Sequence, residues 1–227
     1  RNFSRVIDVW GADHHGHVER LKIATDAVVG YECDLQVLLY QLVTLKRGDE
    51  IIRLSKRSGE IITLDELIEE VGSDAARFFF LLRSPNAQME FDLELAVKKS
   101  NENPVYYIQY AHARMASILE RSRENGRELL KGNVNLLQQA HELALIRQML
   151  RLPEVIEQVT KTFEPHHLAR YAIDFATAFH LFNDAFKQMN DPSMKVLTDD
   201  PELTAARLKL VSTARSVLAR CLQLLGM

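Results

Sequence analysis

Hydrophobic and polar positions in the first hundred residues follow more than one period, which predicts a mixed α/β segment. Residues 6–10 form a short apolar run that Gly11 ends, as expected of a buried strand, and residues 17–29 then suit a helix packed on it. The apolar run 37–45 ends at a Lys-Arg-Gly-Asp-Glu turn, and strand character resumes at residues 51–54. This pattern predicts a β-hairpin.

Helix signals follow the predicted hairpin. Thr63 and the acidic pair after it suit a helix N-terminus, because their oxygens accept hydrogen bonds from the unpaired amides there. A second helix is predicted from Ser73 to about Leu82, where Pro85 and Asn86 stop it.

From about residue 101 the pattern is helical throughout. Helices are predicted at about 104–123, at 136–163 with Pro153 dividing this stretch, from Pro165, and from Pro201. The third carries apolar positions spaced by three or four residues apart from one adjacent pair: Leu168, Tyr171, Ala172, Phe175, Phe179, Phe182 and Phe186. The fourth carries a similar face: Leu210, Val211, Ala214, Val217, Leu218, Cys221, Leu224 and Leu225. Such stripes are typical of a helical-bundle core rather than a cofactor-binding box.

Composition narrows the possible partners only slightly. Residues 1–100 carry 13 Lys and Arg against 17 Asp and Glu, and residues 101–227 carry 15 against 14. The chain as a whole therefore has no polyanion-binding signature, although a local basic patch remains compatible with RNA binding. The apolar run 78–82 is far shorter than the roughly 20 residues of a membrane-spanning helix, so no membrane association is predicted.

Cysteine usage and the first residue bear on context. Cys33 and Cys221 are too few for a disulfide framework or a four-ligand zinc site, which fits a reducing cytosol. No secretory signal is present, and the chain opens with Arg1 rather than Met. We therefore expect a cytoplasmic protein and a chain that is part of a longer polypeptide.

The stretch Trp-Gly-Ala-Asp-His-His-Gly-His at 10–17 joins a predicted strand end to a helix start. Ligands of open α/β sheets bind beyond the carboxyl ends of strands, where Gly11 would allow close approach and Asp13 could accept hydrogen bonds from a ribose diol. The histidines could also bind a metal, but Asp13, His14 and His15 are neighbours and cannot all converge on one ion. Nucleotide contact is favoured, with capping or structural roles as the alternative.

The stretch Arg-Leu-Ser-Lys-Arg-Ser-Gly at 53–59 combines three cations with two hydroxyls. Cations in such a loop could neutralise the charge that develops on a polyphosphate leaving group. A solvated basic turn is the alternative, and composition alone favours it.

The stretch Tyr-Tyr-Ile-Gln-Tyr-Ala-His-Ala-Arg at 106–114 lies on a predicted helix. Tyr107, Tyr110 and Arg114 are spaced i, i+3 and i+7 and therefore share a face. Aromatic rings beside an arginine suit the stacking of unpaired RNA bases. Half-buried packing is the alternative for a tyrosine stripe taken alone.

Together and in this order, these stretches resemble the C-terminal part of a bacterial-type arginyl-tRNA synthetase, a class I aminoacyl-tRNA synthetase. The 9–16 run is similar to the family's late Rossmann-domain loop, and Arg-Leu-Ser-Lys-Arg at 53–57 to the class signature Lys-Met-Ser-Lys-Ser. Asp-Ala-Ala-Arg at 74–77 is close to the Asp-Ala-Leu-Arg sequence that names the family's anticodon-binding domain. The 106–114 run is the most specific piece, and the resemblance covers essentially all 227 residues.

The resemblance implies a mostly α fold in two parts. Residues 1–100 would be the C-terminal part of a Rossmann catalytic domain, with a β-hairpin, the signature loop and connecting helices. Residues 101–227 would be an antiparallel helical bundle of the anticodon-binding type.

The resemblance also implies roles for particular residues. The adenosine pocket for ATP would be lined by Gly11, Asp13, His14 and His15. Ser55 and Lys56 would contact the ATP phosphates, with catalytic roles for Lys56, Ser55 and Arg53. Arg53 stands where the class has its first lysine, and its planar guanidinium is a different hydrogen-bond donor. The tRNA-facing surface would include Tyr107, Gln109, Tyr110 and Arg114.

The implied parent enzyme joins arginine to tRNA(Arg) in two steps, using ATP with Mg²⁺, as a cytoplasmic monomer without a protein-bound metal site. The class also needs a His-Ile-Gly-His-like element at the start of the Rossmann fold, and we interpret the literal match at 14–17 as coincidence. This chain alone is therefore predicted to be inactive. A stand-alone tRNA-binding module is the alternative, and an interaction bundle without RNA is a third reading.

Overall fold

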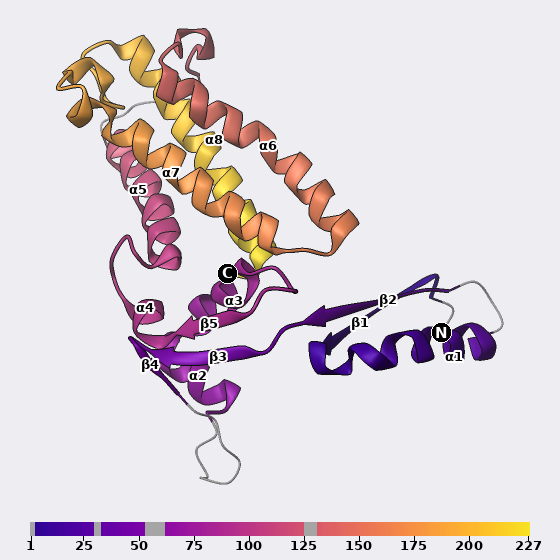
Figure 1. Ribbon diagram of the computed structural model, residues 1–227. Helices are drawn as coiled ribbons and strands as arrows, with labels where there is room; N and C mark the ends of the chain where they lie inside the picture. Colours follow the sequence, from indigo (N-terminus) through magenta and orange to yellow (C-terminus); the bar gives the residue numbers. More distant parts are fainter. Residues whose placement is uncertain (1–2, 30–32, 53–61, 125–130) are drawn as a thin grey trace.

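The computed structural model describes residues 3–29, 33–52, 62–124 and 131–227. Its elements form three consecutive groups (Figure 1): an N-terminal unit of two strands and a helix, a central three-stranded sheet with short helices, and a bundle of long helices. The N-terminal unit projects to one side of the central group. The predicted fold class, mostly α with a partial α/β segment and a hairpin before a helical bundle, is confirmed.

The N-terminal unit has a βαβ arrangement. Strands β1 (Arg5–Gly11) and β2 (Asp34–Tyr40) pair in parallel. Parallel neighbours need a crossover connection, which here consists of the 3-10 turn η1 (Ala12–His17) and helix α1 (Val18–Val29). Because Gly11 pairs with Tyr40, both strands end at the same carboxyl edge of the sheet.

The interpretation of residues 37–45 as one strand is wrong, because the structure divides this run between two sheets. β2 ends at Tyr40, and β3 (Val43–Arg47) belongs to the central sheet. Between them the Gln41 amide donates to the Pro85 carbonyl oxygen at 2.9 Å, and Leu42 is 71% exposed. A continuous apolar run in the sequence does not reveal where the chain leaves one sheet and joins another.

The central sheet contains the predicted hairpin. β3 and β4 (Glu50–Ile51) pair antiparallel across a turn in which Gly48 has a φ of 59°, a conformation that favours glycine. β3 also pairs in parallel with β5 (Met89–Asp92), and the helix α4 (Leu93–Val97) follows at once. The hydrophobic pattern predicts neither β5 nor α4, because both are short.

Helices α2 (Leu64–Val71) and α3 (Ser73–Leu82) complete the central group. α2 begins where predicted, because the Thr63 hydroxyl accepts from the Glu66 amide at 3.2 Å and the Glu66 carboxylate accepts from the Thr63 amide at 2.7 Å. α3 packs on β5 through two phenylalanines whose rings both lie 5.3 Å from that of Phe91, namely Phe79 and Phe80.

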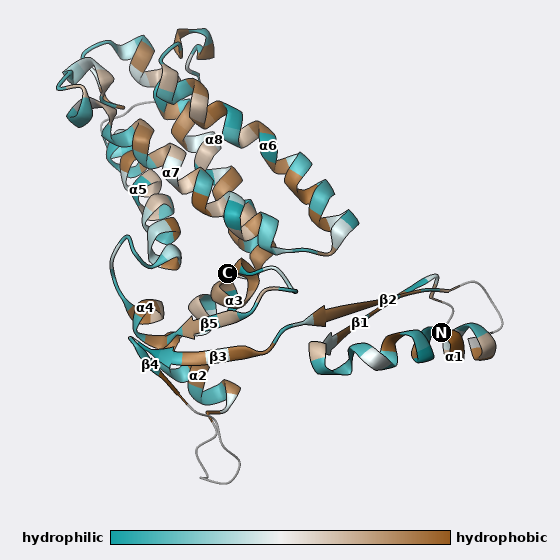
Figure 2. Ribbon diagram, viewed as in Figure 1, coloured by the Kyte–Doolittle hydropathy of each residue, from teal (hydrophilic) through white to brown (hydrophobic). Residues whose placement is uncertain are grey.

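The bundle consists of α5 (Pro104–Glu124), α6 (Ala140–Thr162), α7 (His166–Gln188) and α8 (Pro201–Leu225), and successive helices run in opposite directions (Figure 1). The predicted α7 stripe is buried from Leu168 to Phe182; the side chain of Phe186 lies outside the described part. On α8 the prediction is wrong for Leu224, which is 42% exposed at the end of the helix. Figure 2 shows both hydrophobic and hydrophilic residues around each bundle helix, as expected where one face is buried. Within the described ranges, no helix is long and apolar enough to span a membrane.

Pro153 does not divide α6, contrary to the sequence-based expectation. The helix is continuous from Ala140 to Thr162 with Pro153 inside it. A proline in a helix interior removes one backbone hydrogen bond and favours a kink. Leu152 and Val155 beside it are buried in the bundle core, so tertiary packing holds the helix together across the proline.

A buried ion pair ties α6 to α8. Arg207 and Glu142 have side chains that are 1% and 0% exposed, and Arg207 Nε donates to Glu142 Oε1 at 2.7 Å. The Arg207 guanidinium also donates to the carbonyl oxygens of Ser193 and Lys195 at 2.5 and 2.6 Å. The pair therefore fixes the segment before α8, which includes the short turn η3 (Pro192–Met194).

Candidate functional site

The carboxyl end of β1 places Gly11 and Asp13 in direct contact. A Cβ atom added to Gly11 would lie 2.5 Å from Asp13 Oδ1, closer than real Cβ contacts come. Glycine is therefore required for Asp13 to hold this conformation, with its carboxylate folded over the end of the strand. The carboxylate is 63% exposed at the strand edge where α/β proteins bind ligands.

The neighbouring histidines make different contacts. His14 Nε2 is 3.6 Å from Asp13 Oδ2, and the His14 ring meets the edge of the Trp10 ring at 6.4 Å. Trp10, His14 and His17 line a largely apolar pocket of about 380 Å³. His15 Nδ1 is 3.2 Å from the Ala12 carbonyl oxygen of its own turn. The structure therefore brings Gly11, Asp13 and His14 together, whereas His15 contacts the backbone.

The predicted phosphate-facing residues cannot be placed beside this pocket. Arg53, Ser55 and Lys56 fall within residues 53–61, which lie outside the described residues.

Tyr107 and Tyr110 both contact His180 of α7. The Tyr107 ring lies 4.6 Å from the His180 ring, and the Tyr107 hydroxyl donates to Thr177 Oγ1 at 3.3 Å. The Tyr110 ring is nearly parallel to the His180 ring at 5.7 Å and stacks on Tyr106 at 6.0 Å. We call Tyr106, Tyr107, Tyr110 and His180 the aromatic platform. Tyr110 is 45% exposed, so the platform has a ring open to solvent.

Sequence reasoning missed His180. Burial lowers the pKa of His180, and the Tyr107 carbonyl oxygen, 3.4 Å from Nε2, and Asp184 only partly oppose this effect. The imidazole is therefore neutral at neutral pH and acts as a flat ring beside the tyrosines. Its sequence signal is weak, because it is a polar ring directly after Phe179 of the apolar stripe.

Arg114 lies farther along the same side of α5. It lines a pocket of about 170 Å³ together with Arg121, Asn183 and Lys195. We call these four residues the basic groove. The buried Arg207 guanidinium holds the Lys195 carbonyl, so the core ion pair positions one wall of the groove. Three cations and an amide beside an aromatic platform suit the phosphates and bases of a single-stranded nucleic acid.

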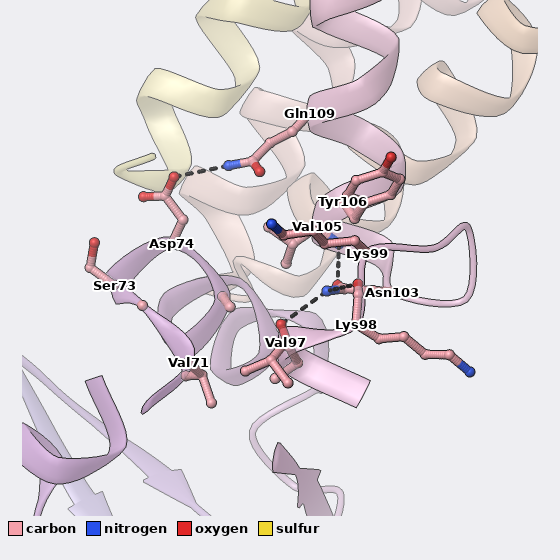
Figure 3. A pocket seen from close by; sticks show the side chains of 13 residues that line it. Val71, Ser73, Asp74, Val97, Lys98, Lys99, Asn103, Val105, Tyr106 and Gln109 are labelled. Carbon is pink, nitrogen blue, oxygen red and sulfur yellow. Dashed lines mark hydrogen bonds between the residues drawn. The ribbon is translucent and has the colours of Figure 1, made fainter. Parts of the chain in front are cut away.

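Gln109 points to another part of the molecule. Its Nε2 donates to Asp74 Oδ2 of α3 at 2.9 Å, which ties the bundle to the central group (Figure 3). Gln109 and Tyr106 line a pocket of about 450 Å³ that also includes Lys98 and Lys99. Of the four residues predicted to face RNA, the structure thus gathers Tyr107, Tyr110 and Arg114 along α7, and Gln109 faces α3.

Comparison with known proteins matches residues 108–227, more than half of the chain, to the DALR anticodon binding domain family. The chain belongs to this family. The matched region starts within α5 and contains Tyr110, Arg114 and all of the three later bundle helices.

The chain is also similar to longer proteins. It is 55% identical over 227 residues to an arginine–tRNA ligase of Dehalococcoides mccartyi, and 47% identical over 230 residues to one of Desulforamulus reducens. Both alignments cover 100% of this chain, but only 39% and 40% of the relatives. The chain thus spans about two-fifths of the length of these curated relatives.

A solved structure agrees with the sequence comparisons. Arginyl-tRNA synthetase of Thermus thermophilus superposes with a TM-score of 0.80 at 26% identity, over 99% of this chain and 40% of that one. The resemblance to arginyl-tRNA synthetases inferred from the sequence is therefore confirmed.

Proposed function

We propose that this chain is the C-terminal part of an arginine–tRNA ligase, which activates arginine with ATP and transfers it to tRNA(Arg). The observation that carries this proposal is the 55% identity to an arginine–tRNA ligase across the entire chain. In this proposal, residues 1–100 contribute part of the ATP site and residues 101–227 bind the anticodon stem-loop. The complete enzyme acts as a cytoplasmic monomer, and the chain alone is inactive.

The nucleotide side of the proposal rests on the edge formed by Gly11, Asp13 and His14. Gly11 leaves room for a ribose, the exposed Asp13 carboxylate accepts hydrogen bonds from its diol, and His14 beside Trp10 offers a flat ring for adenine. His15 supports the turn through the Ala12 carbonyl.

The phosphate side rests on the sequence alone. Ser55 and Lys56 contact the ATP phosphates, and Lys56 and Arg53 stabilise the charge that develops on pyrophosphate as arginine attacks the α-phosphorus. Mg²⁺ accompanies ATP as part of the substrate. The adenylate then passes its arginine to the terminal ribose of the tRNA, without a covalent enzyme intermediate.

The RNA side rests on the aromatic platform and the basic groove. A base of the anticodon loop stacks on the exposed Tyr110 ring, which Tyr106 and His180 support. Neighbouring phosphates meet the cations of the groove, including Arg114. Phosphate contacts release counterions, so tRNA binding weakens steeply as the salt concentration rises.

The RNA part is tested by measuring the affinity of the chain for tRNA(Arg). Tyr110→Ala removes one stacking ring and is expected to weaken binding by about 1–3 kcal/mol, or about 5- to 150-fold. Leu150→Ala is the matched control, because Leu150 is 70% exposed on α6 and belongs to neither the platform nor the groove. Equal affinity of Tyr110→Ala and the unaltered chain, or a flat response to salt, would contradict RNA binding by this face.

The catalytic part needs the full-length parent protein. Lys56→Ala should lower arginine-dependent ATP–pyrophosphate exchange in the presence of tRNA(Arg), while the affinity for tRNA(Arg) stays unchanged. An unaffected exchange rate removes Lys56 from the mechanism. If full-length protein binds tRNA(Arg) but shows no exchange, the stand-alone tRNA-binding module becomes the better description.

A further inference from the structure

The turn between α6 and α7 gathers three metal-ligating side chains. Glu164, His166 and His167 each offer one ligand atom, and these atoms lie within 4.8 Å of one another. Within the part of the chain that the structure describes, no other group of three histidine, cysteine or acidic residues meets this condition. The histidines at 14–17, which the sequence suggested as possible ligands, do not form such a group.

His166 has an unused nitrogen. His166 is only 8% exposed, and its Nδ1 atom is buried without a hydrogen-bond partner. Buried polar groups in native proteins almost always have a partner, so an orphaned imidazole nitrogen needs an explanation. An imidazole nitrogen pairs either with a hydrogen-bonding group or with a metal ion, so a bound metal is one explanation.

His167 is placed between two polar groups that make conflicting demands. Its Nε2 is 3.1 Å from Gln158 Nε2 and 3.3 Å from Glu164 Oε2. If the Gln158 amide donates to this nitrogen, its lone pair cannot also carry a proton for the Glu164 carboxylate. Zinc would take this lone pair and bridge the nitrogen to the Glu164 carboxylate, with the Gln158 side chain turned so that its oxygen rather than its amide nitrogen faces the site.

One of the ligand spacings matches a zinc ion. Zinc binds imidazole nitrogen and carboxylate oxygen at about 2.0–2.2 Å, almost always in tetrahedral geometry, so neighbouring ligand atoms lie about 3.4 Å apart. The 3.3 Å between Glu164 Oε2 and His167 Nε2 matches one edge of such a tetrahedron. An ion pair between Glu164 and His167 explains this distance equally well, but it leaves His166 Nδ1 without a partner.

We propose that the α6–α7 turn is a binding site for Zn²⁺, formed by Glu164, His166 and His167 with water at the remaining position. The site is independent of the proposed function, and the sequence analysis, which predicted no metal site, did not find it. Two imidazoles and one carboxylate with an open fourth position form a donor set that zinc favours.

The α6–α7 turn also lies against the N-terminal unit. The Arg5 guanidinium lies 5.9 Å from the centre of the Phe163 ring. Burial and, to a lesser extent, the negative charge of Glu164 raise the pKa of Tyr40 at the end of β2. Zinc would reduce the negative charge of Glu164 and fix the turn that makes these contacts. Its binding should therefore raise the thermal stability of the chain.

The test uses the full 227-residue chain, freed of any purification tag and stripped of metal with a chelator. Titration calorimetry with Zn²⁺ should show one site, and Co²⁺ should give the visible absorption bands of a tetrahedral complex. Glu164→Gln, His166→Gln and His167→Gln should each weaken Zn²⁺ binding by at least about 10- to 100-fold, the loss typical of removing only an outer-shell partner of a ligand. His112→Gln is the matched control, because it removes a half-buried histidine of α5 and should leave Zn²⁺ affinity unchanged.

Circular dichroism and thermal melts of the metal-free variants separate lost ligands from lost folding. The proposal is overturned if the unaltered chain shows no Zn²⁺-dependent rise in melting temperature, or if the Gln variants at 164, 166 and 167 bind Zn²⁺ as tightly as the unaltered chain. It is also overturned if binding disappears in His14→Gln/His15→Gln, because the metal then sits on the N-terminal unit. Affinity for tRNA(Arg) is measured in parallel and tests the proposed function separately.

Discussion

The N-terminal β1–α1–β2 unit and the helical bundle contain similar apolar residues but bury them to different extents. In the unit, Val9, Ile23 and Val28 are 64%, 68% and 83% exposed. In the bundle, the apolar stripe of α7 is buried from Leu168 to Phe182, and α8 buries ten residues along its length. The bundle therefore closes its own hydrophobic core, whereas the described part of the unit does not.

The difference arises because the two architectures differ in how much of their apolar surface they can bury by themselves. Each bundle helix presents a stripe, and four stripes meet around one core, so burial is satisfied within about a hundred residues. A two-stranded parallel sheet with one helix has faces that such a small unit cannot cover, since parallel sheets are normally covered on both sides. The bundle is expected to be stable as a unit, and the β1–α1–β2 unit only marginally so.

The two cysteines lie in the two regions, and their rates of reaction with thiol reagents should differ more than any other property predicted for the two regions. Cys33 is partly exposed beside β2, whereas Cys221 is buried in α8 and burial raises the pKa of its thiol to about 12. Thiol reagents attack the thiolate, so Cys221 should react only after the bundle unfolds. With a typical unfolding free energy of about 5–15 kcal/mol, it should react at least about a thousandfold more slowly than Cys33 at neutral pH.

Mass spectrometry after timed labelling of Cys33→Ala and Cys221→Ala measures each thiol separately. Fast labelling of Cys221 without denaturant would show that the bundle core opens readily and would remove the contrast between the two regions.

Truncation of one apolar side chain in each region gives the next largest effect. Phe175→Ala removes a ring that is 0% exposed, and should lower the free energy of unfolding by about 3–5 kcal/mol. Val9→Ala removes two methyl groups that are mostly in water, and should change it by less than about 0.5 kcal/mol. Urea unfolding followed by circular dichroism measures both, and losses of similar size would mean that β1 is buried in solution.

Acid should weaken the bundle by a smaller amount. Burial lowers the pKa of four bundle histidines: His112, His141, His166 and His180. The unfolded chain takes up these protons near pH 6.5, whereas the folded chain takes them up only at lower pH, so the unfolding free energy falls as the pH drops below about 6.5.

Urea midpoints at about pH 7.5 and about pH 5.5, measured with a chelator present, check the direction of this effect. His180→Gln should reduce the difference between the two midpoints, because one buried imidazole no longer titrates. A midpoint that rises on acidification would contradict the burial of these rings.

Local signals predicted most elements of the fold. Thr63 and Glu66 form the capping box expected at a helix start, and the α7 stripe is buried as its period indicates. The pattern failed where elements are short or where distant residues decide. Met89–Asp92 becomes a strand because β3 is available beside it, and Gln41 leaves the sheet because the Pro85 carbonyl accepts its amide.

The candidate sites divide in the same way. The contact of Gly11 with Asp13 spans two residues, and the shared face of Tyr107 and Tyr110 follows from helical spacing, so both follow from local sequence. His180 joins the platform from another helix, and Asp74 draws Gln109 toward α3. Neither His180 nor Asp74 is close in sequence to the residue that it contacts, so no local sequence pattern predicts these contacts.

The order of residues was enough to predict the longer helices, the hairpin and the kinds of ligand that each stretch could bind, because caps, turns and periodicity act over a few positions. Which aromatic rings stack, which carboxylate holds Gln109 and which histidine nitrogen stays without a partner depend on helices that meet only after folding. Contacts between residues some 35 to 73 positions apart, such as Asp74 with Gln109 and Tyr107 with His180, arise from packing, and no local pattern encodes them.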